Sequence, residues 1–418
     1  MKRILDFCEQ YSVQLFVLLM CIPALLNIRT GDINSYHTFF YFIDYSTGFG
    51  GKKLLGGICS LWFPKEVGKQ HLLPLITTVL FLMVALFAWF CGKCLSRNQQ
   101  DKRPLILFIA IYLLSPFSFL VFVNMISRVD FYLATATLLF LYLFICHRGK
   151  WYYYLLTLII ICLACLLHHI FCNIFFPLFF ALFIYDIFSD TIHVTKKTAC
   201  YFAISLIVSL LFFSIVLFST MNIDFESLYC YLQERSTDST SALSLKAPLY
   251  YEFYAKLPEH YIAYVQPVLK YNVARFILTI IVLSPLLLLF WVPWILAIRH
   301  SADKREKWCY ILMQLFIHLI ILPAYLMAID YDRWNCAYCF TQFCLILVLY
   351  YLEEKTFVEQ VDKIICLLKQ HFVIVLLMII YISSIDLPNG NSTLSIVDKI
   401  CNKLDLYWIV NEVLPSNI

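Results

Sequence analysis

Apolar stretches of roughly 20 residues recur along the whole chain, and they restrict its fold more than any other feature. A helix needs about 20 mainly apolar residues to cross the hydrocarbon core of a bilayer. Such windows lie at residues 11–28, 72–91, 105–123, 131–146, 151–167, 170–187, 199–219, 276–298, 309–328, 336–352 and 372–385. We therefore predict an all-α, polytopic transmembrane helical bundle of about 11 spans.

Composition supports the same class of protein. The chain is 62% hydrophobic and 14% charged, whereas a soluble domain is about a quarter charged and just under half apolar. These values exclude a soluble globule, a disordered chain and a small disulfide-rich domain. The net charge of +4 is too small to indicate nucleic acid as a partner. We expect one integral membrane domain over residues 1–418, in contact with lipid as a multi-pass protein of the cell membrane.

The distribution of Lys and Arg predicts the orientation. Loops that face the cytoplasm carry an excess of basic residues. With the N-terminus inside, 17 of the 31 basic residues fall in the short loops 1–10, 92–104, 147–150, 188–198, 299–308 and 353–371. The prediction is N-in and C-out. The outer face then carries the loops 29–71 and 220–275 and a C-terminal interfacial segment, 386–418, and long loops on a rigid scaffold are where active sites are usually built.

The first outer loop combines glycine with basic residues. Six of the ten glycines lie between Gly31 and Gly57, around the pair Lys52-Lys53. Glycine lets the backbone approach a ligand closely, and lysine supplies charge for an anion. The loop could cradle a pyrophosphate, although the GxxxxGK[ST] order of nucleotide-binding loops is absent. A flexible interfacial turn with snorkelling lysines is the alternative.

Two further groups of polar residues lie between apolar spans. Arg128 could grip a phosphate through two hydrogen bonds, or it could be a topological anchor paired with the nearby Asp130. His168-His169 could bind phosphate or move a proton, and a purely structural pair is the alternative. We expect only one of these two histidines to matter, because adjacent residues on a helix face different directions.

The segment Asp330-Tyr331-Asp332-Arg333-Trp334 is the sharpest local signal, because two carboxylates and an arginine fall within four positions at a span end. Such a group could hold a charged ligand, and Trp334 suits either an interfacial belt or a platform for a sugar ring. The tyrosine-rich loop 220–275 fits carbohydrate or, more simply, an amphipathic helix in the interface. Seventeen cysteines lie mostly inside spans without matched histidine partners, so we predict no metal site.

The region of residues 25–185 resembles a known family. Arg29-Thr30-Gly31-Asp32 followed by Tyr36, and Arg128 followed about forty residues later by His168-His169, resemble EpsG-like membrane proteins, a group related to Wzy-type polysaccharide polymerases. The resemblance implies an inverting glycosyltransferase that polymerises or transfers undecaprenyl-diphosphate-linked glycan units at the outer face of the membrane. Such enzymes serve capsule, exopolysaccharide or O-antigen biosynthesis, with a chain-length regulator or other glycan-assembly membrane proteins as partners.

Glycosyl transfer of this kind requires cations that stabilise the departing diphosphate and a base that deprotonates the acceptor hydroxyl. The candidates for binding the diphosphate are Arg128, Arg333, Lys52, Lys53 and His169. Asp32 is the leading candidate base, followed by His168 and Asp332. Fixed cations can carry the developing charge, so we expect no cofactor and no metal.

Two other functions compete with this reading. A GT-C-type glycosyltransferase using a polyprenyl-phosphate sugar would share the outer site, but it often has adjacent acidic residues in the first loop, whereas Asp32 stands alone. A lipid-linked oligosaccharide flippase or transporter would place ionisable residues deep inside several spans. Here they cluster at span ends, with His318 the main exception.

Overall fold

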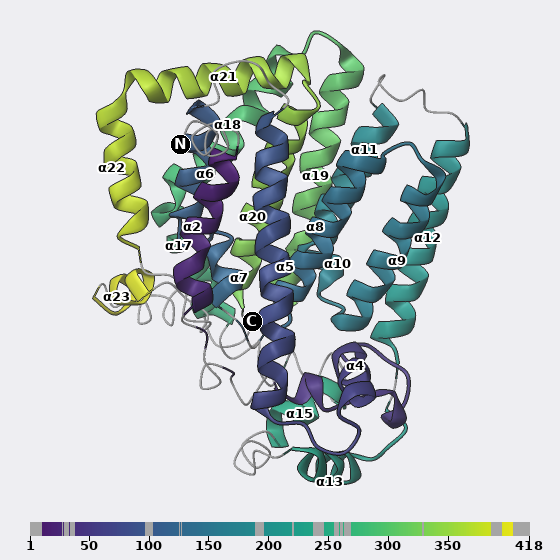
Figure 1. The fold of residues 1–418 in the computed structure, drawn as a ribbon. Coiled ribbons are helices and arrows are strands. Elements are labelled where there is room, and N and C mark those ends of the chain that lie inside the picture. Colours follow the sequence, from purple (N-terminus) through teal and green to yellow (C-terminus); the bar gives the residue numbers. More distant parts are fainter. Residues whose placement is uncertain are drawn as a thin grey trace, which may run out of the picture.

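The protein is described by a computed structural model covering residues 11–26, 28, 33, 38–96, 103–124, 126, 128–188, 196–219, 221–236, 246–254, 259, 262, 269–327, 330–385 and 395–403. This part of the chain is all-α and forms no strand, which confirms the predicted class (Figure 1). Its one isolated β-bridge joins Val67 and Ser236.

Most helices run side by side in a bundle, and a smaller group of elements covers one end of it (Figure 1). The bundle consists of α2 (Ser12–Leu26), α5 (Lys69–Ser96), α6 (Arg103–Leu113), α7 (Leu120–Asn124), α8 (Asp130–His147), α9 (Trp151–Leu167), α10 (Phe171–Ile174), α11 (Phe176–Phe188), α12 (Lys196–Leu217), α17 (Leu269–Val282), α18 (Ser284–His300), α19 (Lys304–Met327), α20 (Tyr331–Tyr351) and α22 (Phe372–Ser383). We call the covering group the cap, which comprises η2 (Phe39–Tyr41), η3 (Tyr45–Thr47), α4 (Leu54–Trp62), α13 (Phe225–Arg235) and α15 (Lys246–Phe253). A short helix, α23 (Ser395–Lys403), lies near the lower end of α22.

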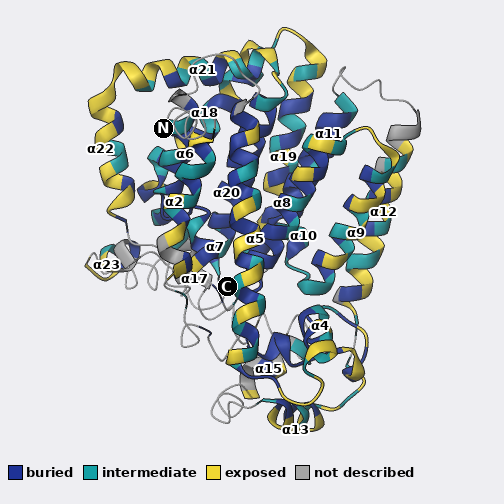
Figure 2. Cartoon of the chain, viewed as in Figure 1, coloured by how far each residue is buried: buried dark blue, intermediate teal, exposed yellow. Residues whose placement is uncertain are grey.

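Helix α20 forms the centre of the bundle, and every residue from 336 to 350 is buried (Figure 2). Aromatic rings from several helices meet its own. Phe343 stacks on Tyr112 of α6 with ring centroids 4.1 Å apart, and Phe87 of α5 lies within 6.3 Å of both Phe340 and Phe343. Offset ring contacts of this kind add to the gain from burial. The core is therefore a set of interlocked aromatic rings around one helix.

The outer helices present apolar side chains to their surroundings, as a helix in lipid does. Four described helices are long and apolar enough to cross a membrane, and up to six if two bent pairs each count as one span. The chain is therefore an integral membrane protein. Several predicted windows form shorter helices, because they are interrupted near Pro116 (between α6 and α7) and Pro177 (at the start of α11). Eleven spans and the N-in, C-out orientation stay predictions.

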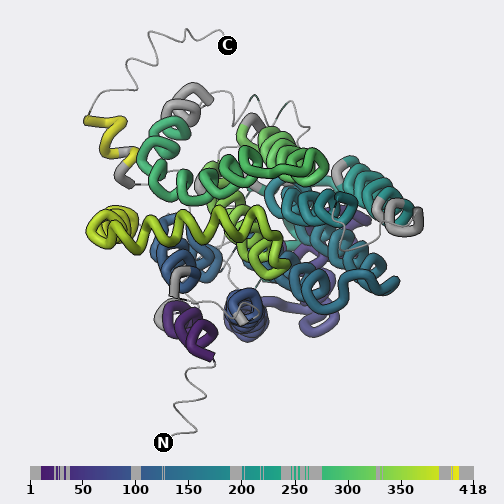
Figure 3. Tube along the Cα trace, turned by 90° about the horizontal axis from the view of Figure 1, so that it is seen from above, coloured from purple at the N-terminus to yellow at the C-terminus, as the bar shows by residue number. Residues whose placement is uncertain are grey.

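The end of the bundle away from the cap is crossed by α21 (Lys355–Gln370). Its buried residues Phe357, Val361 and Ile365 recur every four positions, so one face packs on the bundle. Helices α21 and α22 meet at 95°, and α22 stands end-on at the margin in the view from above (Figure 3). The predicted cytoplasmic loop 353–371 is thus mainly an amphipathic helix.

Glycine at position 56 lets α4 lie directly against the backbone of the cap. A Cβ atom on Gly56 would lie 1.8 Å from the carbonyl oxygen of Ile43, which is a backbone atom that cannot rotate away. At the neighbouring Gly57, the same atom would meet the ring of Tyr45 at 2.9 Å, and a side chain can move. A methyl group at Gly56 would therefore clash with fixed backbone, whereas one at Gly57 would meet a side chain that can move.

We predict that Gly56→Ala destabilises the cap strongly and that Gly57→Ala does so much less. Overpacking typically costs about 1–3 kcal/mol, and the clash at Gly56 is with backbone, so its cost should lie at the upper end. Limited proteolysis of the purified protein, followed at the segment between α4 and α5, measures the difference. Equal protease sensitivity of the two variants would contradict this account.

Candidate functional site

The predicted site residues that the structure describes lie at the end of the bundle that carries the cap. Lys52 donates its backbone N–H to the carbonyl of Leu166 at the end of α9 (2.9 Å). The ring of Phe40 in η2 lies 5.9 Å from that of His168, between centroids. Asp32 lies outside the described residues. Asp332 belongs to the first turn of α20, but its side chain also lies outside what the structure describes.

A further contact connects the cap to α8. Tyr41 donates a hydrogen bond from its hydroxyl to that of Tyr132, at 3.2 Å, and both side chains are buried. Tyr132 belongs to the first turn of α8, which Arg128 precedes. The cap is therefore fixed to the helix ends that carry Arg128 and His168.

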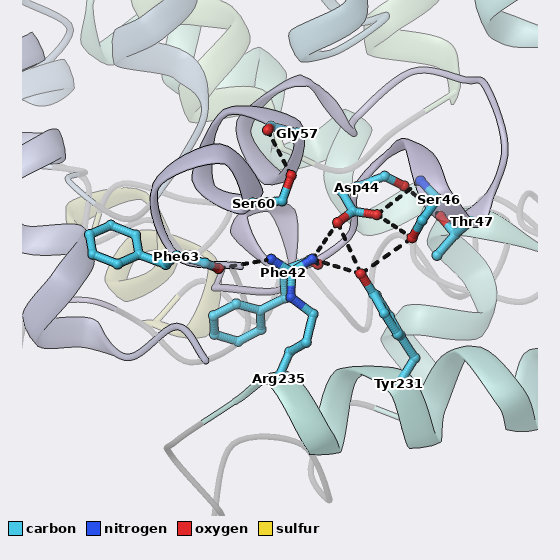
Figure 4. A network of polar contacts seen from close by, with 9 residues as sticks. All are labelled: Phe42, Asp44, Ser46, Thr47, Gly57, Ser60, Phe63, Tyr231 and Arg235. Atoms are coloured by element: carbon cyan, nitrogen blue, oxygen red, sulfur yellow. Dashed lines mark hydrogen bonds and ion pairs between the residues drawn. The ribbon is translucent and has the colours of Figure 1, made fainter. Parts of the chain in front are cut away.

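An ion pair that the sequence analysis missed holds the cap together (Figure 4). Arg235 at the end of α13 donates from Nη1 to Asp44 Oδ2 at 2.5 Å and to the carbonyl of Phe42 at 3.0 Å. Tyr231, one turn earlier on α13, donates from its hydroxyl to the same Asp44 oxygen at 3.0 Å. Both charged side chains are largely buried. The two cap segments, separated by almost two hundred residues, are thus joined by charge-assisted hydrogen bonds.

The second oxygen of Asp44 is held within its own segment. Oδ1 accepts hydrogen bonds from the hydroxyl of Ser46 (2.5 Å) and from its backbone N–H (3.0 Å), which caps the short helix η3. Burial raises the pKa of Asp44, but the bonds from Ser46 and Tyr231 and the charge of Arg235 outweigh it and leave the pKa below its usual value. Asp44 therefore stays ionised at neutral pH, as an acceptor that organises the cap.

Lys53 lies almost fully buried next to this network. Its ammonium group donates to the carbonyl oxygens of Gly48 (2.7 Å) and Thr47 (3.4 Å), and the side chain is 1% exposed. Burial lowers the pKa of Lys53 to about 8, against the opposing influence of the charge on Asp44. The group therefore loses its proton near the pH at which many enzymes work, and its hydrogen bonds fold the 47–53 turn.

We predict that the unfolding temperature depends on pH through Lys53. Its folded-state pKa of about 8 lies below the ordinary 10.5, so the unfolded chain binds more protons between these two values. Stability must then rise with pH between about 8 and 10.5. Lys53→Met should abolish this part of the rise in thermal unfolding curves, whereas Lys65→Met, at an exposed position of the same segment, should retain it. Identical pH profiles for the wild type and Lys53→Met would contradict the assignment.

Lys52 adopts a backbone conformation that only a few residues tolerate. Its φ angle is +65°, in the left-handed region, and the side chain is largely buried with its ammonium 5.8 Å from the ring centroid of Phe253 in α15. The strained residue places the turn against α9 while directing the charge toward the aromatic ring of α15. Lys52 and Lys53 thus point to different partners.

The glycines next to these lysines allow close packing on α12. A Cβ atom on Gly50 would lie 2.5 Å from the hydroxyl of Ser219, and one on Gly51 would lie 2.6 Å from Cγ1 of Val216. Tight contact between the turn and α12 therefore explains both glycines without a ligand. The predicted pyrophosphate cradle is not tested by this contact.

Arg333 lies between two carboxylates at the N-terminal end of α20. Its Nε and Nη2 atoms donate to the two oxygens of Asp130, each at 3.0 Å, and Nη1 donates to Asp330 at 2.7 Å. Asp130 is buried, and the guanidinium lies 5.5 Å from the ring of Trp334. A planar guanidinium matches a carboxylate in this two-point geometry. Asp130 therefore takes part in a long-range pair that joins α8 to α20, and its predicted local pairing with Arg128 stays a prediction.

Removing Arg333 would leave the buried Asp130 without this cation, and removing Asp130 would leave Arg333 with only Asp330 of its two carboxylates. We predict that Arg333→Met and Asp130→Leu each lower stability by about 3–5 kcal/mol and that the double variant recovers much of the loss. Denaturant titration in detergent gives the coupling energy of the cycle. The exposed Lys363–Glu359 pair on α21 is the matched control, and we expect its coupling to be much weaker because solvent screens both charges. Additive losses at Arg333 and Asp130 would overturn this assignment.

Arg128 and the two histidines lie at helix ends on the side of the bundle that carries the cap. Arg128 is half-buried in the connection between α7 and α8. His168 ends α9, and its Nδ1 accepts a hydrogen bond from the backbone N–H of Ile170 (3.2 Å), which shapes the turn into α10. The rings of His168 and His169 lie 4.8 Å apart, and both side chains are half-buried. Two imidazoles thus lie at the surface between the bundle and the cap.

A chain of polar side chains joins α18, α19 and α20, with Tyr338 buried at its centre and His318 exposed at one end. Trp291 donates from Nε1 to the hydroxyl of Tyr338 at 2.5 Å, and that hydroxyl lies 3.1 Å from Nε2 of His318. The other ring nitrogen of His318 lies 2.7 Å from the carbonyl of Gln314. A carbonyl can only accept, so Nδ1 carries a proton, and in the neutral imidazole Nε2 accepts from Tyr338. Side-chain hydrogen bonds thus join the three helices.

One turn further along, Gln314 and Gln342 exchange hydrogen bonds at 2.9 and 3.3 Å. Together with the contact of Tyr325 to Asn335 (2.7 Å), these pairs follow the seam between α19 and α20. Local sequence gave a signal for His318 alone. The glutamine and tyrosine partners are ordinary residues in apolar windows, and only the packing of the two helices brings them together.

No family model, curated protein or solved structure matches the chain. Within the described ranges, no three His, Cys, Asp or Glu side chains lie close enough to hold a metal ion. What the structure presents is an all-α integral membrane protein with a polar, aromatic cap and several cations at one end.

Proposed function

We propose that the protein polymerises or transfers glycan units carried on undecaprenyl diphosphate, at the membrane face covered by the cap. The observation that carries this proposal is the gathering of Arg128, His168, His169 and Lys52 at one end of the bundle, around the attachment of the cap. The cap end is assigned to the outer face of the cell membrane by the proposed N-in, C-out orientation with 11 spans.

Charge development in the reaction suits these side chains. Breaking the glycosidic bond to the diphosphate releases negative charge, which Arg128 and His169 would stabilise. The hydrogen bonds of Lys53 and Arg333 within the protein favour a positioning role for both, with Arg333 fixing the ends of α8 and α20. Asp32 remains our proposed base, with His168 and Asp332 as the other candidates. Neither a cofactor nor a metal is part of this proposal.

Aromatic side chains of the cap support a carbohydrate substrate. Tyr250 and Tyr254 of the α15 segment lie parallel with centroids 6.3 Å apart, and Phe225 of α13 lies edge-on to each of them. Tyr250 is 39% exposed. Aromatic rings with polar tips present a flat apolar face together with hydrogen-bonding groups, a combination that suits sugar rings. Partners in such a pathway would include a chain-length regulator or other glycan-assembly membrane proteins.

Sizing the lipid-linked glycans of a deletion strain complemented with variants tests this function. We expect Arg128→Ala to abolish polymer and accumulate single repeat units while the protein still inserts in the membrane. Arg299→Ala, an exposed arginine at the end of α18, should give wild-type glycan length. Normal polymer with Arg128→Ala would remove Arg128 from the site, and truncated units in the deletion strain would instead indicate a single-sugar transferase of the GT-C type.

The hydrogen-bonded chain of Trp291, Tyr338 and His318 favours a second candidate, a lipid-linked oligosaccharide flippase or transporter. Ionisable side chains within membrane-spanning helices often mark a transport path. His318→Phe would then trap glycan units on the inner leaflet, whereas a polymerase would retain function. The same glycan measurement, combined with a probe of sidedness, separates the two candidates.

A further inference from the structure

Helix α4 of the cap is apolar on two faces. None of its nine residues is charged. Leu55, Gly56 and Cys59 are buried against the cap, whereas Ile58, Leu61 and Trp62 are exposed. These three positions follow the i, i+3, i+4 spacing of one helix face. Leu61 is 82% exposed and Trp62 is 76% exposed, so the described part of the chain leaves this face uncovered.

The depth of α4 relative to the bundle is fixed by the turn that precedes it. The backbone N–H of Lys52 binds the carbonyl of Leu166 at the end of α9, and Gly51 lies against Val216 near the end of α12. Helix α4 begins two residues later and lies just beyond the ends of α9 and α12 (Figure 1). Helix α4 therefore lies at the edge of the apolar region that α9 and α12 form.

An apolar stripe on the bundle ends next to the turn that leads into α4. Ile207, Leu211 and Ile215 form an exposed stripe along α12, with a spacing of four residues. The stripe ends at Phe218, which is 73% exposed and adjoins Ser219, the residue that Gly50 approaches. Figure 2 shows exposed residues both along α12 and on α4. In an integral membrane protein, a stripe of this kind contacts lipid chains.

The turn between η3 and α4 adds aromatic side chains to the same boundary. Phe49 is 51% exposed and stacks on the ring of Tyr45, with centroids 6.1 Å apart. Together with Trp62, they are the residue types that anchor proteins at the level of lipid headgroups. Charged residues of the cap occupy other elements, such as Lys246 and Glu226 of α15 and α13.

We propose that the face formed by Ile58, Leu61 and Trp62 inserts into the bilayer at the boundary between headgroups and acyl chains. The occupant of this face is lipid. Burial of three large apolar side chains stabilises such contact, and the indole of Trp62 suits the interface. The cap is then positioned in two ways, by its hydrogen bond to α9 and packing on the end of α12, and by insertion of α4 into the lipid. This proposal does not depend on the proposed function.

Collision accessibility of a nitroxide label tests the insertion in nanodiscs of phosphatidylethanolamine and phosphatidylglycerol. The label is placed at Leu61→Cys, after the exposed native cysteines 146, 200, 230 and 366 are replaced by serine. Glu234→Cys, at an exposed position of α13, is the matched control in the same cap. We expect oxygen to relax the label at position 61 several-fold more effectively than a water-soluble nickel chelate does. The order should be reversed at position 234.

A second measurement keeps the proposal falsifiable if the labelled variants fold poorly. Trp62→Phe should remove a component of tryptophan emission that lipids brominated near the headgroup quench, whereas Trp294→Phe, at a buried position, should leave that component in place. Preferential quenching of the Trp62 component by aqueous iodide would overturn the proposal. Low accessibility of position 61 to both oxygen and nickel chelate would also overturn it, because a protein partner would then cover the face.

Discussion

The arginine between Asp130 and Asp330 is the interaction on which the arrangement at the cap end depends. Three charged side chains at the ends of α8 and α20 are expensive to keep near an apolar interior unless they neutralise one another. The two-point contact with Asp130 fixes both the separation and the rotation of these helices. Because α20 is also the centre of the aromatic core, this pair sets the position of the helix around which the others pack.

The cap repeats the same principle on a smaller scale. Once the two segments meet, Asp44 accepts hydrogen bonds from Ser46, Tyr231 and Arg235, and Arg235 also donates to the carbonyl of Phe42. The charge pair joins the segment before α4 to the segment after α12. Backbone contacts of the 50–52 turn then bind the cap to the bundle. Polar contacts thus organise the cap, whereas aromatic packing organises the bundle.

Hydropathy predicted the all-α membrane class because a helix that crosses a bilayer must be mainly apolar along its whole length. The same rule says little about breaks, so the windows around Pro116 and Pro177 were read as whole spans although each contains a division between helices. Local charge patterns located Arg333 and Arg128 at span ends. They did not reveal that Asp130 pairs with Arg333, because these residues lie 203 positions apart and nothing in either segment encodes its partner.

The contacts of the cap could not be predicted for the same reason: their partners lie far apart in the sequence. Asp44 and Arg235, 191 positions apart, each look like ordinary loop residues. The lysine pair was noticed for its charge, but burial and hydrogen bonds to carbonyls depend on how the turn folds. Glycines near these lysines suggested a ligand, whereas their neighbours in α12 are a sufficient reason for them. Residue type therefore located the region, and only tertiary contacts distinguished binding candidates from structural ones.

The central position of α20 bears on how such a chain can diversify. A helix enclosed on all sides by rings leaves no room for a change in side-chain volume without adjustment of several neighbours. Helices α12 and α22, whose outer sides are exposed, tolerate any apolar residue there. Substitutions among descendants of this sequence should therefore accumulate on the outer helices. Around Phe340 and Phe343 they should be rarer and accompanied by compensating changes in neighbouring residues.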